Sequence, residues 1–151
     1  MALLFSSIFS SKDKVKLVEA ITESEKKTSG EIRLFMEAKC EKDALERAIE
    51  VFHELKMIET EARNGILIYV AFESRKIAIY GDTAIHQLLG LGYWDDTIKE
   101  LIQKFKKKRY TSGLIECIHD LGEKLAKYFP ITANDRNELP NDIVFGDDML
   151  D

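Results

Sequence analysis

Acidic residues border several apolar segments of this chain, and they are the side chains best placed to do chemistry. Asp82 follows the apolar segment 77–80, Asp95 and Asp96 begin a helical pattern, and Glu31 opens an earlier apolar segment. If strands bring these ends together, carboxylates from separate parts of the chain share one edge of a sheet. Carboxylate oxygens without histidine or cysteine suit Ca²⁺ or Mg²⁺ better than zinc. The three aspartates are therefore candidate ligands of a divalent cation, with Glu31 as a neighbour.

Each of these acids also has a purely structural explanation. Asp82 and Asp95 stand where a helix N-cap is wanted, and an acid near a helix start is favourable without any ion. Glu31 has a solvated surface position as its alternative. Like charges gathered at one edge repel each other unless an ion, a proton or solvent relieves them. The residues alone leave both explanations open.

Three further residues flank the predicted cation site as candidate pocket residues. His86 lies one helical turn after Asp82, Trp94 directly precedes the paired aspartates, and Asn64 precedes the apolar segment 66–72. His86 is a candidate ligand or general acid, although a single helical histidine is more often an ordinary surface or core residue. Trp94 is a candidate pocket wall, and its alternative is to anchor its loop in the core.

One basic run, 104–110, reads Lys-Phe-Lys-Lys-Lys-Arg-Tyr. It falls at a predicted helix C-terminus, where cations offset the helix dipole. That structural role is one interpretation, and docking of an acidic partner or of the chain's own acidic tail is the other.

Hydrophobic periodicity predicts alternating helices and strands that would position these residues. Ser10 and Asp13 have the spacing of a capping box before the first helix. Strands are expected over 31–37, 66–72 and 76–80, and helices over 44–55, 83–89, 95–108 and 112–129, in addition to one that ends before Thr28.

The order of these elements predicts an α/β fold. The continuous apolar segment 66–72 is typical of a strand covered on both faces, and the short connection 73–75 indicates an antiparallel hairpin to the next strand. We expect a three-layer α/β/α sandwich with a mixed, mostly parallel central sheet. One domain should span 1–133. The remainder, 134–151, contains six acidic residues and one basic residue, and is expected to be a flexible tail.

The composition is that of a soluble globular protein, with 45% hydrophobic and 32% charged residues among 151. A net charge of −5 gives no positive field for nucleic acid, and no apolar stretch reaches the ~20 residues of a membrane span. Cys40 and Cys117 form no metal or disulfide motif, so reduced, buried thiols are expected. The apolar start of the chain lacks a basic region before it, which argues against a secretory signal. These features together predict a cytoplasmic protein.

Several short motifs resemble the TPM-domain family, which includes a thylakoid-lumen phosphatase involved in photosystem repair. They are Thr-Ser-Gly-Glu-Ile at 28–32, Arg-Asn-Gly with its apolar run at 63–71, Arg-Lys-Ile-Ala-Ile-Tyr-Gly-Asp at 75–82, Gly-Tyr-Trp-Asp-Asp at 92–96 and Phe-Pro at 129–130. The resemblance covers roughly 15–140. The chain is similar to the freestanding branch of the family, without the signal peptide and membrane anchor of many relatives.

The resemblance implies a family divalent-cation site at the Gly81-Asp82 and Trp94-Asp95-Asp96 turns. It further implies a metal-dependent phosphomonoesterase acting on a phosphorylated small molecule or protein, with catalytic residues unassigned. The chain departs from extended relatives, which carry Gly-x-Gly-x-Glu where this sequence reads Gly-Asp-Thr-Ala-Ile at 81–85. The missing acid bears on catalysis more than on metal binding. The alternative is a non-catalytic interaction module without an obligatory metal.

Overall fold

The computed structural model describes residues 8–90, 92–131 and 143–149. In chain order the elements are α2 (Ser11–Glu25), β1 (Glu31–Glu37), α3 (Ala44–Glu54), the 3-10 helix η1 (Met57–Glu59), β2 (Gly65–Ala71), β3 (Lys76–Gly81), α4 (Thr83–Leu89), α5 (Asp95–Lys106), α6 (Tyr110–Tyr128), β4 (Val144–Phe145) and the 3-10 helix η2 (Asp147–Met149). The predicted helices and the first three strands are all present, within a few residues of their expected ends.

The sheet has four strands in the order β3-β2-β1-β4. β1 runs parallel to both β2 and β4, whereas β2 and β3 form an antiparallel hairpin. The predicted mixed, mostly parallel sheet with one hairpin is therefore confirmed. β2 lies inside the sheet and every one of its residues is buried, as its continuous apolar sequence indicates.

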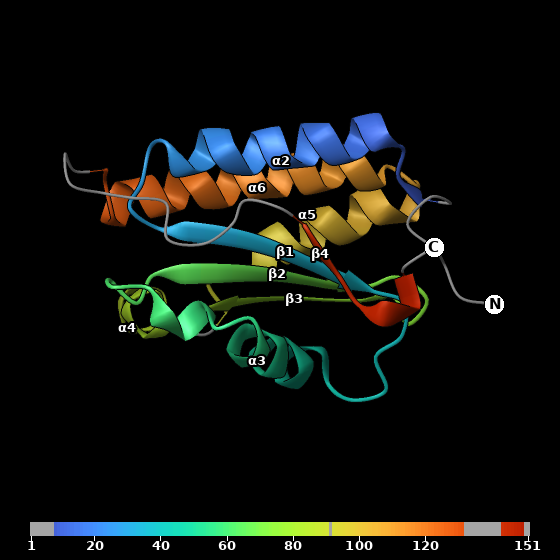
Figure 1. Ribbon diagram of the computed structural model, residues 1–151, viewed down its shortest axis with the longest axis horizontal. Coiled ribbons are helices and arrows are strands. Elements are labelled where there is room, and N and C mark those ends of the chain that lie inside the picture. The colour runs from blue at the N-terminus through green and yellow to red at the C-terminus, as the bar shows by residue number, and fades with distance from the viewer. Residues whose placement is uncertain (1–7, 91, 132–142, 150–151) are drawn as a thin grey trace.

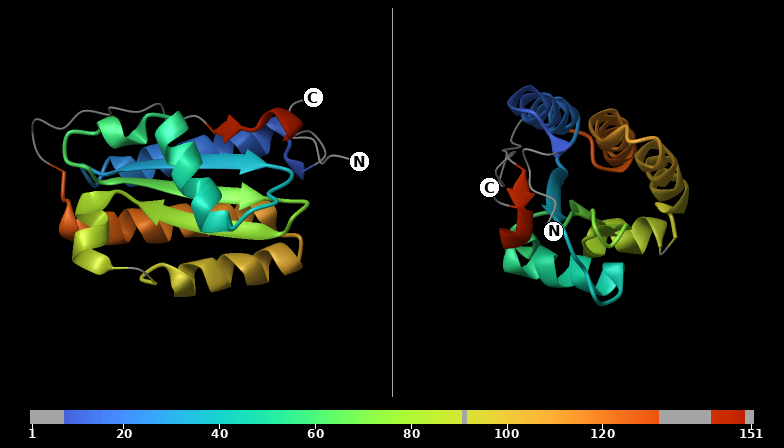
Figure 2. Two further views of the ribbon diagram at one scale, coloured as in Figure 1. Left: turned by 90° about the horizontal axis from the view of Figure 1, so that it is seen from below. Right: turned by 90° about the vertical axis from the view of Figure 1, so that its right-hand side faces the viewer.

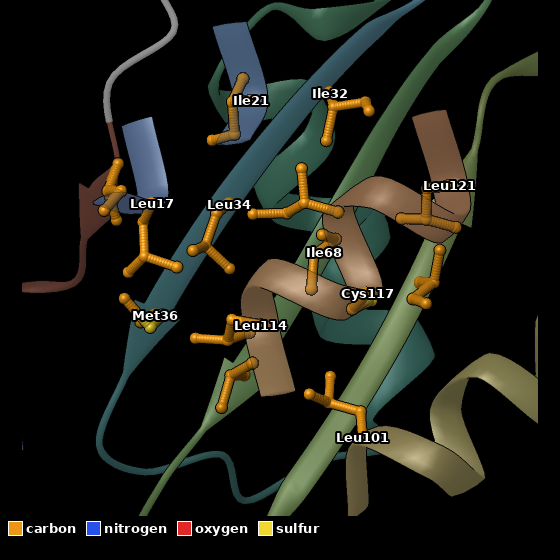
Figure 3. Packing of buried hydrophobic residues seen from close by; sticks show 14 of the residues in the cluster. Leu17, Ile21, Ile32, Leu34, Met36, Ile68, Leu101, Leu114, Cys117 and Leu121 are labelled. Atoms are coloured by element: carbon orange, nitrogen blue, oxygen red, sulfur yellow. The ribbon is translucent and has the colours of Figure 1, made fainter. Parts of the chain in front are cut away.

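Helices cover both faces of the sheet, which makes three layers (Figure 1). On one face α2, α5 and α6 pack on strand residues that include Ile32, Leu34 and Ile68, and Figure 3 shows this larger core at close range. On the other face α3 packs through Ala48, Val51 and Phe52 against the alternate residues of the strands. The expected α/β/α sandwich is what the chain forms.

Local sequence signals start the helices where they were expected. Ser10 Oγ accepts from the Asp13 N–H (3.0 Å), and the Asp13 carboxylate accepts from the Ser10 N–H (2.9 Å), which completes the capping box of α2. Asp43 caps α3 by accepting from the N–H groups of Leu45 and Glu46. These caps satisfy amide groups that would otherwise lack partners at a helix start.

The segment 143–149 adds a fourth strand to the sheet, where sequence analysis expected a flexible acidic tail. Val144 and Phe145 pair with Phe35 and Met36 of β1. Met149 is fully buried, and the Asp148 carboxylate accepts hydrogen bonds from the backbone N–H groups of two residues that follow β1. The difference arises because a two-residue strand has no periodicity that a sequence pattern could reveal. Residues 134–142 lie outside the described part of the chain.

None of the described helices is long and apolar enough to cross a membrane.

Candidate functional site

Asp82 is a buried acid at the end of β3, where it caps α4 and pairs with an arginine. It is 1% exposed, and its Oδ1 accepts from the Thr83 N–H (2.6 Å). Arg63 binds both carboxylate oxygens, with Nε–Oδ2 at 3.0 Å and Nη2–Oδ1 at 3.2 Å. The structure thus places a guanidinium where sequence analysis expected an inorganic cation.

Glu31 begins β1 at the same end of the sheet as Asp82. Its backbone pairs with Gly65, whose carbonyl also accepts from the Asp82 N–H (2.9 Å). The Glu31 side chain is 2% exposed and lies beside that of Glu25, at the end of α2. Burial, together with the like charge of Glu31, raises the pKa of Glu25 to about 8, although the N–H of Ile32 donates to its carboxylate. Glu31 therefore belongs to a pair of neighbouring carboxyl groups, of which its own is buried and that of Glu25 is half-buried.

Asp95 and Asp96 lie in the first turn of α5 and are both exposed. Neither carboxylate forms a hydrogen bond or ion pair with any described residue. The positive end of the α5 dipole stabilises the negative charge of both carboxylates. Trp94, at the N-cap position, has no side-chain hydrogen bond that caps the helix. The backbone of the preceding loop comes close to Asp95: Gly92 has φ +85°, and a Cβ on it would stand 3.3 Å from Asp95 Oδ2.

A hollow of about 240 Å³ lies beside β3, and we refer to it as the β3 hollow. Its floor is β3 itself, from Ile77 to Gly81. One wall comes from the start of α3 with Asp43, and the other from α4 and α5 with His86, Trp94 and Asp95. Two of the predicted pocket residues, His86 and Trp94, and one predicted ligand, Asp95, thus meet at a single concave surface.

The remaining predicted residues do not join this hollow. Asn64 is buried at the start of β2, where its Nδ2 donates to Ser29 Oγ (3.2 Å). Asp82 faces Arg63, and Glu31 faces Glu25. Within the described ranges, no three side chains of histidine, cysteine, aspartate or glutamate are grouped closely enough to hold a metal ion as they stand.

Trp94 is 7% exposed, so it anchors its loop in the core as well as lining the hollow. Its ring packs edge-to-face on Tyr93 at 4.7 Å between centroids, and Lys124 Nζ lies 5.9 Å from the Trp94 centroid. Lys124 also contacts Asp120 (2.9 Å), which accepts from Thr97 Oγ1 (2.7 Å). These contacts hold the start of α5 against α6, which gives Asp95 and Asp96 a fixed support.

Both cysteines are buried free thiols, as expected. Burial raises the pKa of Cys117 to about 12, so this thiol is protonated at neutral pH and is a poor nucleophile. The basic run spans the last turn of α5 and the connection to α6, and its first residue, Lys104, forms an ion pair with Glu116 of α6 (3.4 Å).

Sequence reasoning missed a second polar cluster, at the opposite end of the sheet. Glu37 is 7% exposed and binds Arg47 through two hydrogen bonds, at 2.9 and 3.2 Å, while the Tyr69 hydroxyl donates to it as well. Arg47 further contacts Glu50 (3.3 Å). The available signal was a charged residue at the end of an apolar strand, which is informative only once a partner from another element is identified.

The fold and these clusters define a single α/β domain with an acidic hollow beside its edge strand β3. A family model described as the TPM domain matches residues 5–124, so the chain belongs to the TPM-domain family. The resemblance seen in the sequence motifs is thereby confirmed.

Solved structures agree with this membership. The NMR structure of the BA42 protein from the psychrophilic bacterium Bizionia argentinensis is 42% identical, with a TM-score of 0.85, and the match covers 91% of this chain and 95% of that chain. The solution NMR structure of the N-terminal domain of a protein from P. gingivalis is 12% identical, with a TM-score of 0.66 over 82% of this chain and 80% of that one, which shows the fold alone. Comparison with curated proteins gave no match.

Proposed function

We propose that this TPM-domain protein binds a divalent cation, Ca²⁺ or Mg²⁺, at the start of α5, with Asp95 and Asp96 as its first ligands. The observation that carries the proposal is that both carboxylates are exposed and have no ion pair among the described residues, while Asp95 lines the β3 hollow. Hard cations take oxygen ligands and retain water, so two carboxylates on an open surface suit them. Backbone carbonyls of the loop before Asp95 are further oxygen donors.

Asp82 joins this site only if Arg63 releases it. The Arg63 side chain is 41% exposed, whereas that of Asp82 is 2% exposed, so the guanidinium can move into solvent without disturbing the core. A bound divalent cation would then take the place of the guanidinium as the positive partner of the buried carboxylate. Glu31 stays a neighbour in this proposal, because its buried carboxyl lies against Glu25.

Thermal unfolding in excess EDTA, and then with Ca²⁺ or Mg²⁺, tests the cation proposal. A cation present at about 100 times its dissociation constant should add ~2.7 kcal/mol, or very roughly 5–11 °C in Tm for a domain of this size. Asp96→Asn should abolish the shift. Asp147→Asn, which removes an exposed acid in η2, should retain it. The absence of any shift in the wild type would leave Asp95 and Asp96 as helix-start residues and favour the metal-free interaction module.

A phosphatase activity is the second candidate, and the position of the hollow beside Asp95 and His86 is what favours it. Since the charged residues that line the hollow are acids, a phosphate monoester would be repelled there without a cation. A bound cation would supply the polarisation of a phosphoryl oxygen, and a carboxylate or His86 could exchange a proton with the reacting water or leaving group.

Turnover of para-nitrophenyl phosphate by the purified protein, with and without Ca²⁺ or Mg²⁺, tests this second candidate. The expected result is activity that requires the cation and is lost in Asp96→Asn, with His86→Gln reducing the rate and leaving the cation-induced Tm shift intact. A Tm shift without any turnover would retain cation binding and reject the phosphatase.

A further inference from the structure

β3 is an edge strand of the sheet. About half of its backbone N–H and C=O groups therefore point outward, on the side away from β2. In an antiparallel pair, residues alternate between those bonded to the partner strand and those directed outward. The Asp82 N–H donates to the Gly65 carbonyl of β2 (2.9 Å). Every second residue before Asp82 therefore also bonds to β2. The backbone groups of the residues between them, Ile77, Ile79 and Gly81, face the open edge. They have no hydrogen-bond partner among the residues that the structure describes.

This open edge is recessed in the β3 hollow. The start of α3 lies on one face of the sheet and α5 on the other, while α4 crosses the end of β3, so the edge runs between helices (Figure 2). A second folded sheet that approached β3 edge-to-edge would have to enter between these helices. A single extended chain is the shape that fits.

The charged side chains that line the hollow determine which side chains an added segment should carry. Asp43 lies in the wall from α3, and Asp95 lies in the wall from α5, on the opposite face of the sheet. No lysine or arginine lines the described hollow, and His86 is its only other ionisable side chain besides Tyr80. The two acids therefore favour basic side chains, and they disfavour an acidic segment such as 143–149 of a second copy.

We propose that the open edge of β3 binds an extended basic segment of a partner protein by strand addition. Successive side chains of a strand point to opposite faces, so two basic residues separated by an odd number of positions would reach Asp43 and Asp95 at the same time. Backbone hydrogen bonds to Ile77, Ile79 and Gly81 would supply affinity, and the two acids would supply selectivity.

The opposite edge of the same sheet already binds an extended segment in this way. There β4 pairs with β1, and the Asp148 carboxylate accepts from the N–H groups of Ala38 and Lys39. The sheet thus accepts a short strand combined with one polar anchor. The β3 edge likewise offers unpaired backbone N–H and C=O groups. Its anchors are the acidic side chains Asp43 and Asp95, which favour basic side chains on the added segment.

Titration of ¹⁵N-labelled protein with two six-residue peptides tests the proposal. Both peptides contain two lysines, two valines and two threonines and carry blocked ends; one has lysines at its second and fifth positions, the other at its second and fourth. EDTA is present throughout, so the outcome is independent of the proposed cation site. We expect the first peptide to shift the amide signals of Ile77, Ile79 and Gly81, to slow their hydrogen exchange, and to bind about 1.5- to 5-fold more tightly than the second.

Matched variants separate strand addition from non-specific attraction. Asp43→Asn retains the N-cap of α3, because asparagine caps as well as aspartate, and should weaken the first peptide about 1.5- to 5-fold, as should Asp95→Asn. Asp147→Asn, which removes an exposed acid beside the opposite edge of the sheet, should leave peptide binding unchanged. A version of the first peptide with N-methylated backbone nitrogens should not bind.

Three outcomes would overturn the proposal. One is equal binding by both lysine peptides and their glutamate counterparts, and another is a set of shifted signals away from β3. The third is concentration-dependent self-association of the peptide-free protein through β3, which would make a second copy the occupant of this edge.

Discussion

Arg63 and Asp82 form a two-bond ion pair in which the cation is solvated and the anion is buried. The Arg63 side chain is 41% exposed, and that of Asp82 is 2% exposed. Arg63 adopts φ 52°, in the left-handed region, at the connection that leads into β2. The pair therefore joins a strained loop to the start of α4, and it neutralises an acid that otherwise would have only one backbone donor.

Replacing Arg63 tests this relationship. Arg63→Met keeps much of the side-chain length but leaves Asp82 buried without its cation, so the free energy of unfolding should fall by about 1–3 kcal/mol in EDTA. Arg75→Met is the matched control, since Arg75 is exposed and has nearly the same backbone conformation (φ 55°). That control should stay within about 0.5 kcal/mol of wild type. Urea denaturation measures both.

Arg63→Met also bears on cation binding. If Asp82 joins the cation site, removing its guanidinium competitor should tighten Ca²⁺ or Mg²⁺ binding, as measured by calorimetric titration. Unchanged or weaker binding would exclude Asp82 from the ligand set.

Tyr69→Phe should destabilise the cluster around Glu37. Burial, followed by the hydrogen bond to Glu37, raises the pKa of Tyr69, so the hydroxyl remains a donor at neutral pH. Losing that donor leaves a carboxylate that is 7% exposed with Arg47 alone, at a cost of about 1–3 kcal/mol in the free energy of unfolding. Tyr80→Phe, on the neighbouring strand, should cost less than about 0.5 kcal/mol. Equal losses in the two variants would show that the Tyr69 hydroxyl contributes only packing.

Glu25 should make the protein less stable at alkaline pH. Its pKa is about 8 in the folded protein against 4.5 ordinarily, so the folded state retains a proton that the unfolded state loses. The resulting contribution is complete below the unfolded pKa and is lost as the pH rises through the folded pKa. The free energy of unfolding should therefore fall between about pH 5 and pH 9, by on the order of 5 kcal/mol from this group.

Glu25→Gln should flatten that pH dependence, because glutamine retains the acceptor for the Ile32 N–H and does not ionise. Glu23→Gln changes an exposed acid on the same helix and should retain the wild-type slope. Denaturant unfolding of the wild type and the two variants at several pH values measures the free energy of unfolding as a function of pH. A wild-type slope in Glu25→Gln would assign the pH dependence to other groups.

Met149→Ala should show that the segment 143–149 belongs to the core. Met149 is fully buried, and truncating a buried methionine to alanine costs about 2–5 kcal/mol. Asp147→Ala, two residues earlier and exposed, should change the free energy of unfolding by less than about 0.5 kcal/mol. A small loss in Met149→Ala would mean that η2 dissociates from the sheet readily in solution.

The sequence was sufficient to predict most elements, because their signals are local. The Ser10–Asp13 capping box, the short connection before β3 and the apolar run of β2 each depend on residues close together in the chain. β4 could not be found in this way, since its two residues pair with β1 across more than a hundred positions.

In the candidate site, too, the features with local sequence signals were predictable and the long-range contacts were not. Sequence reasoning placed Asp82 and Glu31 at strand ends, and the structure has both at one end of the sheet, flanking Gly65. Which acid is neutralised, and by what, was not predictable. Arg63 itself has the left-handed backbone conformation from which its side chain reaches Asp82. Glu25 meets Glu31 because the end of α2 lies beside the start of β1. Neither arrangement has a sequence signature.

The pairing of β1 with β4 sets an order of events during protein synthesis. β1, β2, β3 and the helices that cover them precede Val144 in the chain, so the outer edge of β1 lacks its partner strand until β4 is made. An unpaired strand edge is a template for aggregation. Chaperone binding to the emerging chain should therefore be strongest in the interval before residues 143–149 clear the exit tunnel.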